Sequence, residues 1–187
     1  MAFTSRIAAA VVSAGLALTI GAPGAAAADR PRLNLDPFVL ASGSSPHCLE
    51  IGGWSTDNGA PVQQWSCHGG NNQSWRAPGG GQVVNAHTGK CLEIGGWSTE
   101  NGASAQQWDC NGGANQKWEW ALSGALGGGE ILRNVWSGKC LDVPGGAVLW
   151  GPGYFNGVRM QQWDCWNSRN QQWFIFSPGG AYRPVDY

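Results

Sequence analysis

The sequence predicts an all-β fold in which three equivalent lobes close around one shared core. Three observations support this: an internal threefold repeat, short β-prone runs separated by turn residues, and an unusual composition. The chain has 187 residues, including 12 Trp, 30 Gly and only two Met. Long polar stretches of Asn, Gln and Gly argue against a helical bundle, and tight turns suit a protein built from many short strands.

The repeat is the strongest signal in the chain. Its first copy, from Cys48 to Trp75, and its second, from Cys91 to Trp118, are identical at 21 of 28 positions. A third copy runs from Cys140 to Trp173 and carries six extra residues before its Asn-Gly pair. One copy cannot bury its own apolar face, so the three must share a core. A closed barrel also leaves no exposed sheet edge.

Each lobe is expected to contain about four short strands. In the second lobe we place them at 82–86, 90–94, 105–109 and 116–121. Similar quartets begin with the aliphatic runs at 38–42 and 130–135, giving about twelve strands in total. The second strand starts at the Cys-Leu-acid motif and the third holds Gln-Gln-Trp. Between these two strands lie turn residues that tolerate positive φ, which are Asn58-Gly59, Asn101-Gly102 and Asn156-Gly157.

Residues 1–28 are typical of a secretory signal. Arg6 provides a positive start, residues 7–20 are apolar, and four alanines precede a cleavage position before Asp29. The apolar run is too short for a membrane span of about 20 residues. We therefore expect a secreted, extracellular protein without a membrane span, in which residues 29–36 form a linker.

The six cysteines suggest disulfides, because an exported chain with an even number of cysteines commonly forms them. Six cysteines allow about 15 pairings. Only pairing within each repeat respects the symmetry, and it gives Cys48–Cys67, Cys91–Cys110 and Cys140–Cys165. The alternative, a zinc site, is disfavoured because no C-x2-C spacing occurs. We expect no metal.

Charge and motif content disfavour several functions. A net charge of −1 with 12% charged residues disfavours a nucleic-acid partner. His47, His68 and His87 share no spacing and are expected to be surface or turn residues. No hydrolase or metalloprotease motif is present, and the repeated acids fall one to a lobe rather than in facing pairs. We therefore expect neither an enzyme nor a cofactor.

Three Gln-x-Trp motifs, with each Trp eight residues after a cysteine, carry a family resemblance. They are Gln73-Ser74-Trp75, Gln116-Lys117-Trp118 and Gln171-Gln172-Trp173. Together with the cysteine pairs, the pattern resembles the ricin B-chain type lectins and the related bacterial carbohydrate-binding modules of family 13. The resemblance covers residues 37–176, leaving 177–187 as a tail. It implies a β-trefoil that binds carbohydrate.

The tryptophan of each Gln-x-Trp motif is expected to be a core anchor. If both residues lie in one strand, Gln and Trp face the same side. The partner Gln could then fix loop backbone. Trp75, Trp118 and Trp173 would give the core three symmetric aromatic side chains.

The resemblance implies one sugar site in each lobe. In that family a carboxylate accepts hydrogen bonds from two sugar hydroxyls, and an aromatic ring stacks on the sugar. An Asn side chain forms a hydrogen bond with a hydroxyl, and a Gln side chain borders the pocket. The matching residues are Asp142, Gln161, Trp163 and Asn170 in the third lobe, Glu50, Gln63, Trp65 and Asn72 in the first, and Glu93, Gln106, Trp108 and Asn115 in the second.

The first two sites depart from this pattern, because Glu replaces the family's Asp at positions 50 and 93. The longer side chain moves the carboxylate and adds rotational entropy. Both sites carry an extra aromatic, Trp54 or Trp97, that either stacks on a sugar or folds back on its own lobe. Asp142 is expected to be partly exposed. The aromatic insertion of the third lobe, with Trp150, Tyr154 and Phe155, either lengthens a sugar platform or covers the site.

Two functions follow. The first is a secreted carbohydrate-binding protein that uses up to three sites on a polysaccharide or on glycoprotein glycans. The alternative is a secreted protein-interaction or inhibitor trefoil whose sugar pockets are degenerate. The sequence names neither the sugar nor the oligomeric state.

Overall fold

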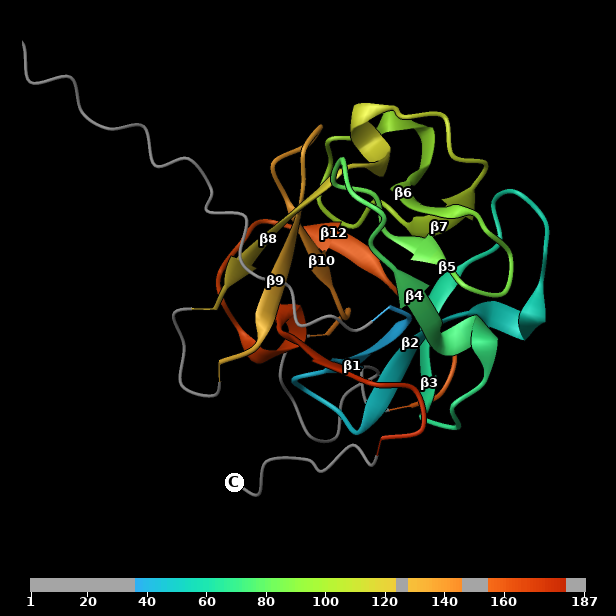
Figure 1. The fold of residues 1–187 in the computed structure, drawn as a ribbon. Helices are drawn as coiled ribbons and strands as arrows, with labels where there is room; N and C mark the ends of the chain where they lie inside the picture. Colours follow the sequence, from blue (N-terminus) through green and yellow to red (C-terminus); the bar gives the residue numbers. More distant parts are fainter. Residues whose placement is uncertain (1–35, 124–127, 146–154, 181–187) are drawn as a thin grey trace, which may run out of the picture. The chain divides into compact units, whose positions relative to one another are not determined.

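A computed structural model describes residues 36–123, 128–145 and 155–180, and its strands form three lobes (Figure 1). Lobe 1 contains β1 (Phe38–Ser42), β2 (His47–Ile51), β3 (Val62–Ser66) and β4 (Ser74–Arg76). Lobe 2 contains β5 (Val84–Asn85), β6 (Cys91–Ile94), β7 (Ala105–Trp108) and β8 (Trp118–Leu122). Lobe 3 contains β9 (Glu130–Asn134), β10 (Cys140–Asp142), β11 (Val158–Arg159), β12 (Gln161–Trp163) and β13 (Trp173–Phe176). The all-β, three-lobed prediction is confirmed.

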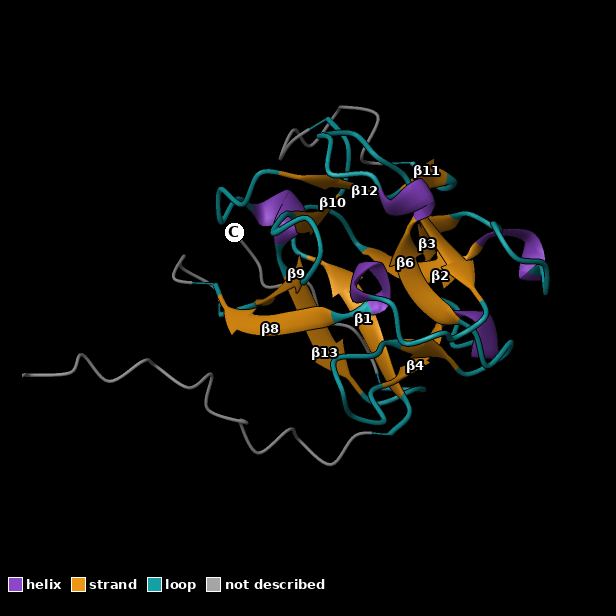
Figure 2. Ribbon diagram, turned by 90° about the horizontal axis from the view of Figure 1, so that it is seen from above, coloured by secondary structure: helices purple, strands orange, loops and turns teal. Residues whose placement is uncertain are grey.

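The first and fourth strands of the lobes build a ring. Antiparallel pairs join β1 with β4, β4 with β5, β8 with β9, β9 with β13, and β13 with β1. Between β5 and β8 the ring is continued by a hydrogen bond from Trp118 N to Gly81 O of 2.8 Å. A hairpin in each lobe, formed by β2 with β3, β6 with β7 and β10 with β12, extends from this ring and is connected by short loops and 3-10 turns (Figure 2). Each hairpin also pairs with a ring strand, β2 with β1, β6 with β5 and β10 with β9.

The three hairpins share one register. In lobe 1, Cys48 lies opposite Trp65, and Glu50 lies opposite Gln63. The same cysteine–tryptophan and acid–glutamine pairs occur in lobes 2 and 3. A one-residue slip would turn every side chain to the other face, so this shared register presents the same candidate site residues on each lobe.

The Asn-Gly turns join neighbouring lobes as well as reversing the chain. Asn58 Nδ2 donates to Asp109 Oδ2 at 2.8 Å, and the Asp109 backbone N–H donates to Asn58 Oδ1 at 3.0 Å. The equivalent contacts pair Asn101 with Asp164 and Ser66 with Asn156. Each lobe is therefore tied to the next in a closed cycle, a role of these turns that the sequence pattern does not predict.

One additional strand, β11, raises the number in the described residues to thirteen rather than the expected twelve. It pairs with β3 of lobe 1. Its counterparts between the other lobes are single bridges, Pro61 with Gln106 and Ser104 with Gln161. The extra strand thus lengthens a contact that all three lobe boundaries share.

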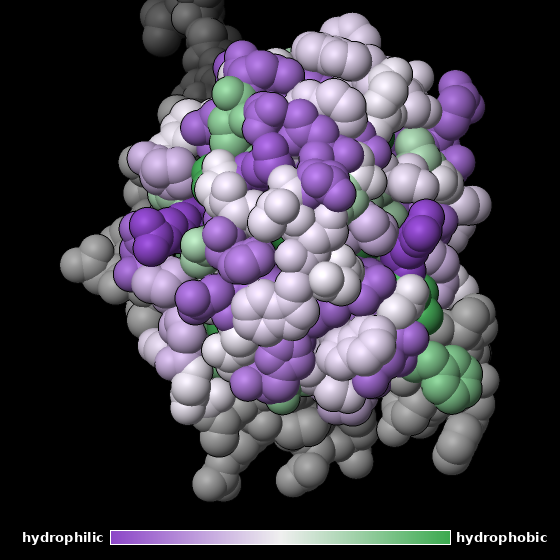
Figure 3. All heavy atoms as spheres, turned by 90° about the vertical axis from the view of Figure 1, so that its right-hand side faces the viewer, coloured by the Kyte–Doolittle hydropathy of each residue, from purple (hydrophilic) through white to green (hydrophobic). Residues whose placement is uncertain are grey.

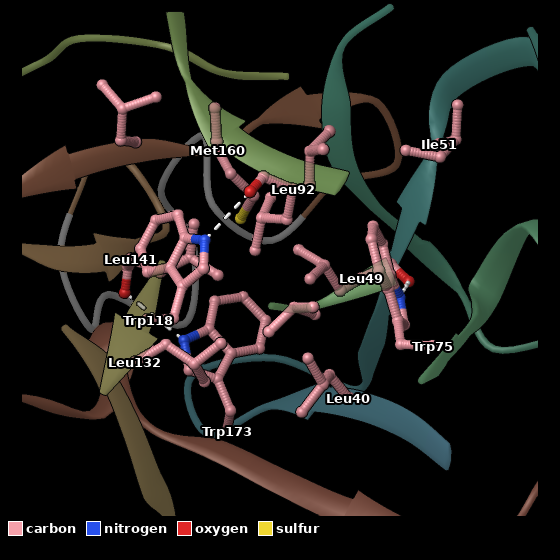
Figure 4. Close-up of a cluster of buried hydrophobic side chains, with 14 of the residues drawn as sticks. Leu40, Leu49, Ile51, Trp75, Leu92, Trp118, Leu132, Leu141, Met160 and Trp173 are labelled. Atoms are coloured by element: carbon pink, nitrogen blue, oxygen red, sulfur yellow. Dashed lines mark hydrogen bonds between the residues drawn. The ribbon is translucent and has the colours of Figure 1, made fainter. Parts of the chain in front are cut away.

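The core is centred on the tryptophans of the three Gln-x-Trp motifs (Figure 4). Trp75 and Trp173 are 0% exposed and Trp118 is 1% exposed, which confirms the prediction of three aromatic anchors. Each indole N–H donates to the carbonyl of the leucine that follows the second-strand cysteine. These acceptors are Leu49 and Leu92 at 3.0 Å and Leu141 at 3.3 Å. The buried N–H groups are thereby satisfied.

The glutamine of each motif does not share a strand with its tryptophan, so that part of the prediction was wrong. Gln73, Gln116 and Gln171 end the 3-10 turns η2 (Asn71–Gln73), η4 (Ala114–Gln116) and η6 (Arg169–Gln171). Their side chains bond backbone as expected: Gln73 Nε2 donates to Ser66 O at 3.0 Å, and its Oε1 accepts from His68 N at 2.9 Å. The turn directs Gln toward the third strand while Trp enters the core.

The three disulfides pair within the lobes, as the repeat predicted. The Cα–Cα distances are 5.1 Å for Cys48–Cys67, 5.1 Å for Cys91–Cys110 and 5.2 Å for Cys140–Cys165. The first and second close loops of 19 residues and the third a loop of 25. Each links the start of a lobe's second strand to the segment directly after its third.

Several predictions fall outside the described residues. The signal at 1–28, most of the linker at 29–36, the insertion residues Trp150 and Tyr154, and most of the tail lie there. Phe155, the last aromatic of the insertion, is described and is 61% exposed. In the part of the chain that the structure describes, no helix is long and apolar enough to cross a membrane.

Candidate functional site

Three side-chain amides converge in lobe 3 around the carboxylate of Asp142, and two of them belong to predicted site residues. Gln161 Nε2, on the opposite strand, donates to Asp142 Oδ1 at 2.8 Å. Asn170 Nδ2 donates to Asp142 Oδ2 at 2.7 Å from the η6 turn. The Gln-x-Trp glutamine Gln171 adds a third amide donor to Oδ2 at 3.0 Å. Three side-chain amides thus fix one carboxylate in one orientation.

Lobes 1 and 2 repeat this arrangement around Glu. Glu50 Oε1 accepts from Gln63 at 2.9 Å, and its Oε2 accepts from Asn72 at 3.2 Å and Gln73 at 3.1 Å. Around Glu93, the equivalent donors are Gln106 at 2.8 Å, Asn115 at 3.3 Å and Gln116 at 2.9 Å. The longer side chain is therefore held by the same three donors as Asp142.

The lobe 1 carboxylate has one further neighbour. His68 Nε2 lies 3.3 Å from Glu50 Oε2. Lobe 2 has Asn111 and lobe 3 Trp166 at the corresponding position. Lobe 1 is thus the one lobe of the three in which a histidine faces the site carboxylate.

All three carboxylates are buried, which contradicts the expectation that Asp142 is partly exposed. Asp142 and Glu50 are each 3% exposed and Glu93 is 5% exposed. Loss of solvent raises the pKa of the Asp142 carboxyl, and the hydrogen bonds from Gln161, Gln171 and Asn170 oppose that rise. The three amides offset part of the cost of removing this charge from water.

The aromatic residue predicted at each site lies at the surface. Trp65 is 38% exposed, Trp108 is 40% exposed, and Trp163 is partly buried. Each indole packs against the Asn-Gly turn of the preceding lobe. For example, Gly59 has φ +83°, and a Cβ placed on it would lie 3.7 Å from Trp108 Cζ3. The turn supports one edge of the ring and leaves much of the side chain open to solvent.

Trp54 and Trp97 lie beside the sites of lobes 1 and 2. They end the 3-10 turns η1 (Gly52–Trp54) and η3 (Gly95–Trp97), and are 49% and 47% exposed. A Cβ on Gly70 would lie 2.8 Å from Trp54 Cζ2, and one on Gly113 would lie 2.9 Å from Trp97 Cζ2. Glycine at these positions therefore lets each indole lie close to the loop of its own lobe.

The site asparagines differ between lobes in one atom. Asn72 Oδ1 and Asn115 Oδ1 are buried and have no hydrogen-bond partner in the structure. In lobe 3, Asn170 Oδ1 instead accepts from Ser168 Oγ at 2.6 Å. Glycine occupies the Ser168 position in the other two lobes. A buried acceptor without a donor is costly, so lobes 1 and 2 each have an acceptor still to be satisfied.

Several residues that hold the sites together were not predicted from the sequence. The buried second glutamine of each Gln-Gln-Trp motif bonds the loop of a neighbouring lobe; Gln162 Nε2 donates to Ser98 O at 3.0 Å and Glu100 O at 2.9 Å. Its position within a recurring motif was the available signal. The surface prediction for His47 was also wrong, because this residue is 7% exposed at the start of β2.

One hollow borders the lobe 1 site. It has a volume of about 510 Å3, and its lining includes His68 and Gln73, which contact Glu50, but none of the twelve predicted sugar-site residues. Within the described segments there is no cluster of three or more His, Cys, Asp or Glu side chains that could hold a metal.

Comparisons with known proteins agree with this fold. A designed threefold-symmetric protein, ThreeFoil, is 34% identical, with a TM-score of 0.64 and coverage of 74% of this chain and 96% of that one. An exo-β-1,3-galactanase from Clostridium thermocellum is 29% identical, with a TM-score of 0.65 and the same coverage of this chain. The haemolytic lectin CEL-III is 25% identical, with a TM-score of 0.59 over 72% of this chain. The matched regions make up only 29% of the galactanase and 28% of CEL-III.

No curated protein sequence matches the chain significantly. The family described as the ricin-type β-trefoil lectin domain matches residues 37–173, which is most of the chain. This match covers all three lobes and agrees with the threefold fold and with the lectin neighbours. The chain therefore belongs to the ricin-type β-trefoil lectin domain family.

Proposed function

We propose that this protein is a secreted carbohydrate-binding protein with up to three sites, one in each lobe. The observation that carries the proposal is the threefold repetition of a buried carboxylate held by three amides beside a tryptophan, which is exposed in lobes 1 and 2 and partly buried in lobe 3. Such a site offers the two contacts that a sugar needs. The carboxylate accepts a hydrogen bond from a sugar hydroxyl, and the aromatic ring packs against the apolar face of the pyranose.

The hydrogen-bond geometry limits what each carboxylate offers. An ionised carboxyl group has about four acceptor positions. At Asp142, Oδ2 accepts hydrogen bonds from Asn170 and Gln171, while Oδ1 accepts one from Gln161. This leaves room for one sugar hydroxyl at Oδ1, rather than the two that the family resemblance implies. Glu50 Oε1 in lobe 1 and Glu93 Oε1 in lobe 2 likewise accept one hydrogen bond each, from Gln63 and Gln106, and keep one acceptor position for a sugar hydroxyl.

A glycan array with the purified protein tests the proposal, and the Asp142→Asn variant tests the site. We expect the lobe 3 site of the variant to bind its sugar at least about tenfold more weakly, because a charge-assisted hydrogen bond is worth about 1.5–3 kcal/mol. Asp164→Asn is the matched control, since it makes the same charge change on an exposed side chain of the same lobe. Equal binding by both variants and the unmodified protein would exclude Asp142 from the site.

A protein-interaction role is the second candidate. It is favoured by exposed aromatics outside the predicted sites, namely Phe155 at 61% and Trp166 at 69%. On the face in Figure 3, hydrophilic and intermediate residues predominate in the described part, and hydrophobic residues are scattered rather than gathered into one patch. A blank glycan array together with a tight protein partner would favour this second candidate.

Secretion and domain limits are part of the same proposal. Residues 1–28 would be removed on export, and residues 37–176 would form the lectin domain. Amino-terminal sequencing of the exported protein should begin at Asp29. Retention of the leader in the extracellular protein would contradict this assignment.

A further inference from the structure

An aromatic pair crosses the boundary between lobes 2 and 3. Trp136, on the turn after β9, is 47% exposed, as is Trp97. The two indole rings lie 5.2 Å apart at 86°, edge to face. Trp136 Nε1 also donates to Trp97 O at 2.8 Å. The hydrogen bond and the ring contact together hold Trp136 in place although nearly half of it is open to solvent.

This pair is continuous with the lobe 2 site. Asn115 Nδ2 donates to Glu93, and a Cβ on Gly113 would lie 2.7 Å from Asn115 Oδ1 and 2.9 Å from Trp97 Cζ2. The Trp97 ring therefore lies beside Asn115, and Trp136 lies on the side of Trp97 contributed by the next lobe. From the site outward, lobe 2 thus offers a buried hydroxyl acceptor, a buried amide and then two exposed aromatic rings.

We propose that Trp97 and Trp136 form a subsite for a second sugar ring, so that lobe 2 binds a glycan chain rather than a single sugar. This inference rests on the proposed function of the Glu93 site. The first ring would contact Glu93 and Trp108, and the next ring of the chain would stack on the aromatic pair. Trp136 belongs to lobe 3, so the subsite exists only where two lobes meet.

The angle between the rings defines the class of glycan. A flat crystalline polysaccharide requires coplanar rings that stack on one plane. Rings at 86° cannot lie together on such a plane. The pair instead suits one soluble chain whose successive sugar rings turn relative to each other, as in xylan or β-1,3-linked chains.

The lobes differ at this position, which provides an internal comparison. At the lobe 1 site, His87 of lobe 2 takes the place of Trp136 and meets Trp54 edge to face at 5.1 Å and 82°. In lobe 3, the corresponding residue is the small Ser44. Because the indole offers the largest stacking area, the second-ring subsite is strongest in lobe 2 and weaker in lobe 1.

Calorimetry with two sugar ladders tests the subsite, one from xylose to xylotriose and one from galactose to β-1,3-galactotriose. In at least one ladder, affinity should rise from the monosaccharide to the trisaccharide. Trp136→Ala should lower the trisaccharide affinity of lobe 2 about fivefold or more, the effect expected for a lost aromatic contact, and should leave monosaccharide affinity unchanged. His87→Trp should raise trisaccharide affinity, because it builds the same pair in lobe 1.

Val135→Ala is the matched control, since Val135 is 45% exposed on the same turn and outside the aromatic pair. If Trp136→Ala leaves trisaccharide binding intact, the subsite is overturned, but the Glu93 site is not. Equal loss of mono- and trisaccharide binding also overturns it, because Trp136 would then act on the first ring. An absence of binding to both ladders by a protein that binds another sugar on the glycan array overturns the subsite alone, whereas an array without any binding counts against the proposed function.

Discussion

At the scale of single residues, the carboxylates are the least expected feature. A surface sugar site suggests partly exposed acids, yet Asp142 is 3% exposed. The burial could not be read from the sequence because the three amide donors come from two segments, β12 and η6, that meet only in the fold. The recurrence of acid, Gln and Asn in register did predict that Asp142, Gln161 and Asn170 lie together, whereas no pattern predicted the contact of Gln171 with the carboxylate.

The raised pKa of Asp142 predicts a pH dependence. Desolvation lifts the pKa above its ordinary 3.8, so the folded protein holds this proton to a higher pH than the unfolded chain does. The protonated Asp142 carboxyl therefore contributes fully to the free energy of unfolding below pH 3.8. This contribution is lost as the pH rises through the raised pKa of the folded protein. Sugar binding needs the ionised carboxylate. As the pH is lowered, the affinity of lobe 3 should therefore begin to fall before the pH reaches 3.8. Titration calorimetry from pH 7 to 4 measures this.

Asp142→Asn is the control for that experiment, because it cannot ionise and should show no pH dependence in lobe 3. Urea unfolding at each pH separates loss of binding from loss of structure. If lobe 3 kept full affinity down to pH 3.8, Asp142 would not be titrating above its ordinary range.

The buried and exposed tryptophans should respond differently to truncation. Trp118→Ala removes a fully buried indole and leaves Leu92 O without its donor, so it should lower the free energy of unfolding by about 3–5 kcal/mol. Trp108→Ala, at 40% exposed, should change stability by less than about 1 kcal/mol while weakening sugar binding. Urea unfolding of both variants measures the difference, and similar unfolding midpoints would contradict it.

At the scale of elements, the repeat located most strands to within two residues. The strand expected at 82–86 covers only Val84–Asn85, because a glycine turn precedes it and Gly81 O accepts from Trp118 N instead of forming a longer ladder. The 3-10 turns were missed because two residues of a Gln-x-Trp motif look like alternating strand positions. Trp136 escaped notice because the repeats have His87 and Ser44 at its place, so no pattern marked it.

The contacts of the Asn-Gly turn should contribute to stability. Asn101→Ala removes two hydrogen bonds between lobes 2 and 3 and should lower the free energy of unfolding by about 1 kcal/mol. The pKa of Asp164 should rise only part of the way to its ordinary value, because Lys139, the larger cause of its lowering, remains. Urea unfolding and an NMR titration of Asp164 measure these effects.

Asn71→Ala is a suitable control, because lobe 2 already has Ala114 at the equivalent position of its 3-10 turn. It should leave stability unchanged. A loss as large as that of Asn101→Ala would show that the turn contacts are not specific.

At the scale of the whole molecule, threefold symmetry is exact in register and broken in detail. Each lobe holds one carboxylate with three amides, but each lobe also has a contact of its own. Glu50 faces His68, Asn170 accepts a hydrogen bond from Ser168, and the Trp97 ring contacts the Trp136 ring. The shared features explain why one repeat determines the fold. The differences lie on loops, where a substitution changes what a site contacts without disturbing the common core.

Three sites on one rigid domain should act together on a polymer. Trp65→Ala, Trp108→Ala and Trp163→Ala each remove one surface aromatic without touching a buried carboxylate. With a monosaccharide, each variant should lose one of three independent sites, so calorimetry should report about one site fewer. On an immobilised polysaccharide, linked sites can raise avidity by about 10²–10⁴ through effective concentration, so each single loss should weaken binding by more than the loss of one site in three. Comparing calorimetry with retention on the polysaccharide from the glycan array measures this gap. If one variant abolished binding in both formats while the other two changed nothing, a single lobe would bind sugar and the other two would serve the fold alone.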